Sequence, residues 1–181
     1  MDSLAGQLLI AAPTLVEPNF RRTVVLVAAH GEEGALGLVL NRPSEASVAD
    51  MIEELDGVAG ADARLHVGGP VAPRQVMVLG EFDDPSVIGV RILGDLGLPA
   101  GTVAVSQVAA VTRRARVFAG HAGWGPGQLE AELDEESWII EGLRPEDPFD
   151  EHPESLWTTL LERKGGRFRL VARMPLDPSL N

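Results

Sequence analysis

The stretch Thr23–Leu40, with the sequence TVVLVAAHGEEGALGLVL, decides the fold of this chain. Its first part, Thr23–Ala29, is a continuous β-branched and apolar run, which is typical of a strand buried on both faces. The turn residues His30–Gly34 follow, and Ala35–Leu40 is a second apolar run of strand length. Two such runs around a short glycine-containing turn predict a β-hairpin. Asn41-Arg42-Pro43 ends it.

Outward from this hairpin, short apolar runs bounded by glycine and proline predict further strands. They cover Gln7–Ala12, Arg64–Val67, Gln75–Gly80, Val87–Leu93, Arg116–Ala119 and Trp138–Ile140. Near the end of the chain, Arg167–Met174 has an apolar residue at every second position (Phe168, Leu170, Ala172 and Met174), which predicts a strand with one buried face. Arg167, Arg169 and Arg173 would then point outward and guard an exposed sheet edge.

Helical patterns are interspersed with these strands. Ser47 is a candidate N-cap, and Asp50 takes the capping-box position. The apolar residues Val48, Met51, Ile52 and Leu55 share one helical face, and Gly57 and Gly60 end the segment. Three more helices are expected, in the second half of Thr102–Arg114, from Gln128 to Leu133, and after Pro153, where Leu156, Trp157, Leu160 and Leu161 form an apolar face.

This mixture favours an α+β fold over a doubly wound sheet, because hairpins and helices do not alternate regularly. No internal repeat and no Pro/Gly/Ser-rich linker interrupts the pattern, so residues 1–181 are expected to form a single domain.

Composition excludes several classes of protein. The chain has no cysteine, so disulfide scaffolds, thiol nucleophiles and thiolate metal sites are ruled out. With 27 acidic against 15 basic residues, its net charge of -12 argues against direct nucleic-acid binding. No apolar run is long enough to span a membrane, and Asp2 stands where a signal peptide needs positive charge. A cytoplasmic protein without membrane contact is therefore expected.

The glycine-rich segment Gly120–Gly127 is the strongest local candidate for a binding site. A strand, a glycine turn and a helix N-terminus could cradle an anion, although Glu130 and Glu132 in that helix would repel a phosphate. The alternative is that the glycines only allow a sharp turn. His121 could act as an acid or base, or could be a hydrogen-bonded turn residue. Trp124 could be a ligand platform or a core anchor.

No other constellation indicates chemistry. The histidines lack the paired spacing of metal ligands, no serine stands in a nucleophile elbow, and no cofactor motif occurs. Charge is uneven, however, because residues 130–154 hold 11 carboxylates and a single cation, Arg144, and a basic block follows. These blocks either form a docking face for a basic partner or neutralise each other.

Four blocks of the sequence together resemble the YqgE/AlgH family of bacterial proteins. They are Gly6–Pro43, His66–Val71 (HVGGPV), Gly120–Leu133 (GHAGWGPGQLEAEL) and Phe149 with Trp157, and they cover almost the whole chain in order. The resemblance implies a single α+β domain whose mixed sheet curls into a partial barrel with a few flanking helices. It implies no reaction and no cofactor, because the family has no settled activity. Members are often described as transcriptional regulators.

Two positions depart from the family pattern. His121 stands where members usually have tyrosine, which removes a possible phenol contact with a ligand. Glu136 stands where members often have glycine, and glycine is the residue that best tolerates a left-handed turn.

From the matching motif positions we hypothesise a single binding groove. Its expected members are Asn41, Arg42, Gly68, Gly69, His121, Gly123, Trp124 and Gln128. The leading interpretation is a binding or regulatory protein with an unidentified protein partner or small ligand. The alternatives are an enzyme of unknown reaction using a groove around His121 and Trp124, a DNA-binding regulator, and a purely structural role for these turns.

Overall fold

The hairpin predicted from Thr23–Leu40 is present in the computed structural model, which describes residues 2–60 and 62–175. Strand β2 (Val24–Gly31) pairs antiparallel with β3 (Gly34–Val39). On the other side of β2 lie β1 (Gln7–Ala11) and then β10 (Trp138–Gly142), both antiparallel to their neighbours. The first five residues of β2 are buried, as expected for a strand covered on both faces.

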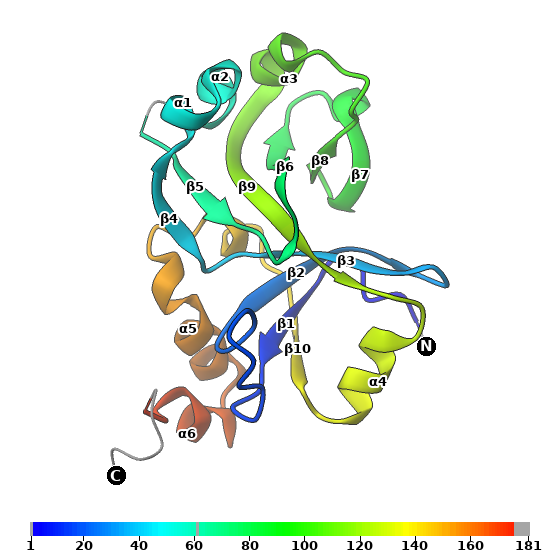
Figure 1. Ribbon diagram of the computed structural model, residues 1–181, viewed down its shortest axis with the longest axis vertical. Helices are drawn as coiled ribbons and strands as arrows, with labels where there is room; N and C mark the ends of the chain where they lie inside the picture. The colour runs from blue at the N-terminus through cyan, green and yellow to red at the C-terminus, as the bar shows by residue number, and fades with distance from the viewer. Residues whose placement is uncertain (1, 61, 176–181) are drawn as a thin grey trace.

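The strands form one curled, mixed sheet (Figure 1). Its order is β10-β1-β2-β3-β9-β6-β8-β7, and β4 and β5 form a branch that joins β9. The β5–β9 pairing is parallel, whereas the other pairings are antiparallel. The remaining strands are β4 (Pro43–Ser47), β5 (Arg64–Val67), β6 (Val71–Phe82), β7 (Ile88–Leu93), β8 (Leu96–Pro99) and β9 (Thr112–Trp124). The expected α+β fold with a partial barrel is confirmed.

Strand β9 is the central strand of the sheet, and it runs from the end of α3 to the turn before α4 (Figure 1). It contributes a residue to each of three apolar clusters. Phe118 lies in the cluster under α5, Val117 in the cluster beside α1, α2 and α3, and Trp124 in the cluster beside α4. The sequence predicted a strand only at Arg116–Ala119 and a turn after it. The strand continues through the glycines because β3 pairs with residues 122–124.

The helices are short and flank the sheet. They are α1 (Val48–Met51), α2 (Asp56–Ala59), α3 (Val105–Val111), α4 (Gln128–Asp134), α5 (Leu156–Lys164) and α6 (Phe168–Ala172). Single 3-10 turns are η1 (Glu53–Leu55), η2 (Pro85–Val87), η3 (Asp147–Phe149) and η4 (Pro153–Ser155). The helix expected after Pro153 is confirmed, with all four of its predicted apolar residues buried.

The helix expected from Ser47 onward is broken into pieces. Ser47 does cap α1, where its hydroxyl accepts from Asp50 N at 3.5 Å. Ile52 then adopts an extended conformation, which redirects the chain so that Leu55 and Val58 reach the core while Met51 stays 62% exposed. The apolar face predicted from Val48, Met51, Ile52 and Leu55 is therefore not a continuous helical face.

The strand predicted over Arg167–Met174 is wrong, because the segment forms α6. The same residues also carry a helical apolar set, in which Ala172 is buried and Phe168 and Val171 pack against the core under α5. Leu170 and Met174, which the alternating pattern places inside, are exposed. Packing against α5 overrides the two-residue period, and the arginines of this segment guard no strand edge.

Candidate functional site

The segment Asn41–Pro43, which leads from β3 into the first residue of β4, is the centre of the candidate site. Asn41 is only 7% exposed and is held on both sides. Its Oδ1 accepts a hydrogen bond from Val24 N at 2.8 Å, and its Nδ2 donates to Arg22 O at 2.8 Å. The amide thus satisfies backbone groups beyond the end of the β2–β3 ladder, and it fixes where Arg42 leaves the sheet.

Three surface hollows meet at this segment. One, of about 230 Å³, is bordered by Arg42, Gly69 and Pro70. A second, of about 550 Å³, shares Arg42 and adds Arg21, Arg22 and Trp157. The third, of about 280 Å³, lies on the other side of Pro43 against β5 and β9. Arg42 borders the first and second hollows and Pro43 borders the first and third, and Arg42 is the charged residue of the two, which makes it the natural centre of a binding surface.

The second hollow concentrates positive charge on an acidic protein. Arg42 Nη2 donates to Arg21 O at 2.7 Å, so the two residues are held together. Within residues 2–60 and 62–175, no carboxylate lies within ion-pair distance of the Arg21, Arg22 or Arg42 guanidinium. Burial, followed by repulsion from Arg21, lowers the pKa of Arg22. Glu154 also borders this hollow but pairs with Arg64, so the three cations keep no ion-pair partner among the described residues, which suits an anionic ligand.

Arg22 is held in a strained position over an aromatic ring. Its guanidinium lies 4.7 Å from the centre of the Trp157 ring, and it also donates to Met174 O. Its φ of 54° is left-handed, a conformation in which a residue other than glycine is disfavoured. Trp157 is itself anchored, because its Nε1 donates to Ala11 O at 2.9 Å. A strained residue beside a rigid aromatic platform is a common feature of binding sites.

The glycines of the expected groove bring two backbones into direct contact. A side chain at Gly69, whose φ is 151°, would come within 2.2 Å of His121 C. One at Gly68 would lie 2.3 Å from Gly120 O, and one at Gly120 would lie 2.5 Å from Gly69 O. These motif glycines therefore let the two motif segments pack tightly, and Gly69 also borders the first hollow.

Trp124 and Gln128 lie in a different place from Arg42. Trp124 is 5% exposed, stacks on Phe20 and meets Trp138 edge-on. Both indoles donate to the same atom, Glu132 Oε2, at 2.8 Å. Gln128 Nε2 donates to Glu132 Oε1 at 3.0 Å, while Gln128 Oε1 accepts from Gly125 N in the turn before α4. Trp124 is therefore a core anchor, and Gln128 holds the turn that leads into α4.

His121 and Gly123 lie on β9, opposite the start of β6. His121 pairs with Val71, and its Nδ1 is buried without a partner among the described residues. Gly123 pairs with Leu36 and is exposed. Neither residue borders any of the three hollows, and Trp124 and Gln128 do not either. Of the eight expected groove residues, Asn41, Arg42 and Gly69 border the hollows, and Gly68 is buried next to Gly69 without bordering any of them.

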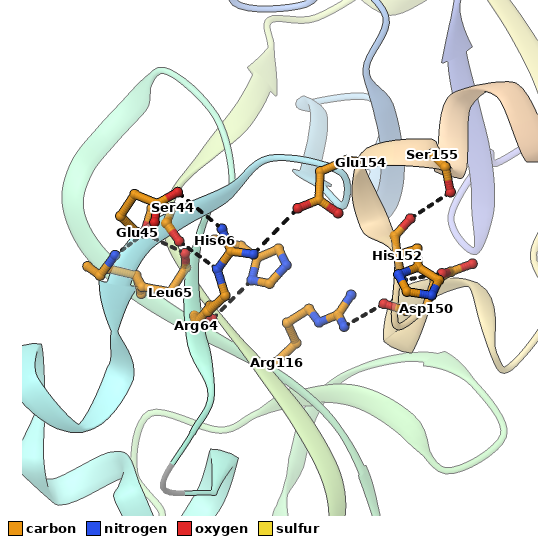
Figure 2. A network of polar contacts seen from close by, with 11 residues as sticks. Ser44, Glu45, Arg64, Leu65, His66, Arg116, Asp150, His152, Glu154 and Ser155 are labelled. Carbon is orange, nitrogen blue, oxygen red and sulfur yellow. Dashed lines mark hydrogen bonds and ion pairs between the residues drawn. The ribbon is translucent and has the colours of Figure 1, made fainter.

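The third hollow contains functional candidates that the sequence analysis passed over (Figure 2). Arg64 and His66 project from the same face of β5, and Arg116 comes from the neighbouring β9. Glu154 from η4 pairs with Arg64 at 3.4 Å. The signal for this cluster was the two-residue spacing of Arg64 and His66 on a predicted strand, but nothing in the sequence indicated that Arg116 would be its neighbour.

The acidic block and the basic block partly neutralise each other. Arg163 Nη1 lies 2.7 Å from Asp147 Oδ1, and Lys164 lies 3.1 Å from Glu141. Among the described residues, no group of three or more His, Asp or Glu side chains is placed to hold a metal ion. That part of the chain also contains no helix long and apolar enough to cross a membrane.

The fold and the site define a class of protein. Its members have a curled half-barrel in which two glycine motifs pack against each other, and an arginine, Arg42, borders a hollow beside them. The AlgH-like family model matches residues 8–169, so the chain belongs to the AlgH-like family. It is 41% identical to a UPF0301 protein of Streptomyces coelicolor, covering 100% of this chain and 97% of the relative. It is 40% identical to a UPF0301 protein of Thermobifida fusca, with 99% and 96% covered.

Two solved structures share the fold. A crystal structure of a Corynebacterium diphtheriae protein superposes with a TM-score of 0.85 at 24% identity, covering 96% of this chain and 93% of that one. The solution structure of the AlgH protein from Pseudomonas aeruginosa superposes with a TM-score of 0.69 at 31% identity, covering 97% and 96%. Both likenesses confirm the curled sheet, and the likeness to the AlgH protein agrees with the family assignment.

Proposed function

We propose that the protein is a non-enzymatic, cytoplasmic binding protein that captures a carboxylate-bearing segment of a partner protein. The binding site is the hollow around Arg21, Arg22 and Arg42, with Trp157 as its platform. The observation that supports this most directly is the crowding of three guanidinium groups with no ion-pair partner among the described residues. Uncompensated arginines bind carboxylates through charge-assisted hydrogen bonds.

The net charge of the whole chain does not prevent this binding. At physiological salt the Debye length is about 8 Å, so distant carboxylates are screened while contacts inside the hollow are not. The nearest acidic side chain bordering the hollow, Glu154, is engaged with Arg64 on the far side. A regulatory role, including one in transcription, would act through capture of a protein partner.

Binding of a labelled tetraglutamate peptide, followed by fluorescence anisotropy, tests this function. Arg42→Ala should weaken binding about tenfold, the effect of losing one hydrogen bond to a charged group. Arg22→Gly should weaken it similarly, while stability changes little because relief of the left-handed strain offsets the lost contact with Trp157.

Arg74→Ala is the matched control, because Arg74 is an exposed arginine on β6 that does not border the hollow. It removes the same charge and should leave binding unchanged. Equal weakening by Arg74→Ala, or no binding of the peptide by the unaltered protein, would contradict the proposal.

Direct DNA binding is a separate regulatory route that salt-titrated gel shifts can test. Phosphate contacts are strongest at low salt, so a DNA-binding protein should give a sequence-preferring complex there. We expect none, because the chain carries a net charge of -12. A specific complex that Arg42→Ala abolishes would replace protein capture with DNA recognition.

A further inference from the structure

The third hollow, behind Pro43, carries a second and independent set of features that point to a ligand. It measures about 280 Å³ and opens between β5, β9 and η4 (Figure 2). Its polar border consists of Asp62, Arg64, His66, Arg116 and Glu151. Arg42, the centre of the proposed partner site, does not border it, so the two sites can be tested separately.

His66 presents an unused nitrogen in this region. The residue is 4% exposed, and its Nδ1 lies 3.1 Å from Arg64 O. Because a carbonyl oxygen can only accept, Nδ1 carries the proton, and Nε2 of the neutral ring holds a lone pair. Nε2 is buried and has no hydrogen-bond partner among the described residues. A buried polar atom without a partner calls for an explanation such as an absent ligand.

Arg116 presents an unused donor beside it. Its Nη2 donates to Asp150 O at 2.9 Å, but its Nη1 is buried without a partner in the described part of the chain. Arg116 precedes Phe118 by two residues, and Phe118 is the residue that pairs with His66 across the parallel strands. The register therefore places the Arg116 side chain and the imidazole on the same face of the sheet, and Figure 2 shows both turned toward one space.

The fixed charges around this space are predominantly negative. From β5, Arg64 faces it and is paired with Glu45 and Glu154. From β9 comes Arg116, on which Asp150 and Glu154 act. Asp62 and Glu151 also border the hollow. An anion added to this cluster alone would bring a further uncompensated negative charge. If His66 gained a proton at the same time, the charge of the cluster would not change.

We propose that this hollow binds a small oxyanion together with one proton, with Arg116 Nη1 donating to the anion and His66 Nε2 taking up the proton from solvent. The resulting imidazolium then donates to a second oxygen of the anion. The two unpartnered nitrogens would both be satisfied, and Arg64 would border the bound group. A carboxylate and a tetrahedral phosphate-type anion both have this chemistry.

The charge environment of His66 explains why the proton should arrive only with the anion. Burial, together with the positive charges of Arg116 and Arg64, lowers the pKa of His66 to about 4, against a smaller opposing effect of Glu154. Without a ligand the ring is therefore neutral near pH 7. An anion beside Nε2 opposes the two arginines, and linkage requires that protonation tighten anion binding by the same factor.

The experiment follows the imidazole nitrogens of the intact protein by NMR while pH is varied, with sulfate or acetate added. Sulfate represents a phosphate-type ligand and acetate a carboxylate. With the preferred anion in the millimolar range, the pH at which His66 protonates should rise by about one unit, a tenfold linkage. Whichever anion produces the larger shift identifies the ligand class. The His66 signal is assigned by its loss in His66→Gln.

Two arginine variants on β9 show whether Arg116 is the anion donor. Arg116→Gln should abolish the anion-induced shift, and Arg116→Lys should retain part of it. Arg113→Gln removes an exposed arginine of the same strand that pairs with Asp83 and Asp95, and it should leave the shift intact. A His66 titration that neither anion moves, or a shift that persists in Arg116→Gln, would overturn the proposal and leave the Arg42 site unaffected.

Discussion

At the scale of single residues, most polar side chains of the motifs form hydrogen bonds within the protein and are not free to bind a ligand. Asn41 bonds two backbone groups, and Gln128 accepts a hydrogen bond from Gly125 N in the turn before α4. Glu132 accepts from two indoles at once, which fixes the Trp124–Trp138 pair. Arg42 differs from these residues, because its guanidinium makes one backbone contact and faces two hollows. The binding proposal therefore depends on Arg42 rather than on Trp124.

Glu136 gives a prediction at this scale. It follows α4 with φ at 55°, so the left-handed turn forms even though the favoured glycine is absent. Glu136→Gly should raise the free energy of unfolding by about 1 kcal/mol, because the left-handed strain disappears. Urea denaturation measures this change. Glu135→Gly is the control, since Glu135 has φ at -81° and should lose stability. Destabilisation by Glu136→Gly would contradict the strain argument.

At the scale of elements, ion pairs fasten the C-terminal helices to the edge of the sheet. Asp147 of η3 is 7% exposed and accepts two hydrogen bonds from Arg163 of α5, at 2.7 and 3.0 Å. Arg163 also donates to Gly142 O at the end of β10. One buried guanidinium thus links η3, α5 and β10.

Removal of Asp147 tests that link. Asp147→Ala should lower the free energy of unfolding by about 3 kcal/mol, because the mostly buried Arg163 charge then keeps only its longer ion pair with Glu141, at 3.7 Å. The double variant with Arg163→Met should recover much of the loss. Asp95→Ala, which breaks an exposed pair with Arg113, should cost less than about 1 kcal/mol. Thermal or urea unfolding of the four proteins decides, and equal losses for Asp147→Ala and Asp95→Ala would show that burial of the pair is unimportant.

Elements with a strong local signal were predictable from the sequence, and those set by packing were not. The hairpin, β1, β5, α5 and the Ser47 cap follow from apolar runs and capping residues. Strands β4 and β8 were not predicted, because Pro43–Ser47 is polar and Leu96–Pro99 is very short. The helix α6 was misassigned because its residues fit both a two-residue and a helical period, and contact with α5 selects the second.

The candidate site was predictable only in part. The motifs identified Arg42 and the glycines, and the glycines do bring their segments together. They could not show that Trp124 is buried in a core cluster and borders none of the three hollows. Nor could they place Arg116 beside His66, because that contact depends on parallel pairing between strands far apart in the sequence.

At the scale of the whole molecule, one strand couples the cores to the third hollow. Strand β9 supplies residues to three apolar clusters and also carries Arg116. His66 packs against Phe118 of the same strand, with their ring centres 5.6 Å apart. A charge on His66 would therefore lie against a core residue of the central strand. We expect it to change the free energy of global unfolding rather than to cause a local movement.

The stability of the whole protein should accordingly fall as the pH drops from about 6.5 toward 4. In the unfolded chain His66 has its ordinary pKa of 6.5, whereas in the folded protein burial and the neighbouring arginines lower the pKa to about 4. Between these values only the unfolded state takes up the proton, so the contribution of neutral His66 is complete above pH 6.5 and is lost on acidification.

The loss should reach at most about 3 kcal/mol in the absence of sulfate and acetate. Urea unfolding at a series of pH values measures it, and the difference between the unaltered protein and His66→Gln removes the contribution of the carboxylates. His152→Gln is the control, because His152 is exposed and should leave the pH dependence unchanged. A curve for His66→Gln parallel to that of the unaltered protein would show that His66 does not couple protonation to folding.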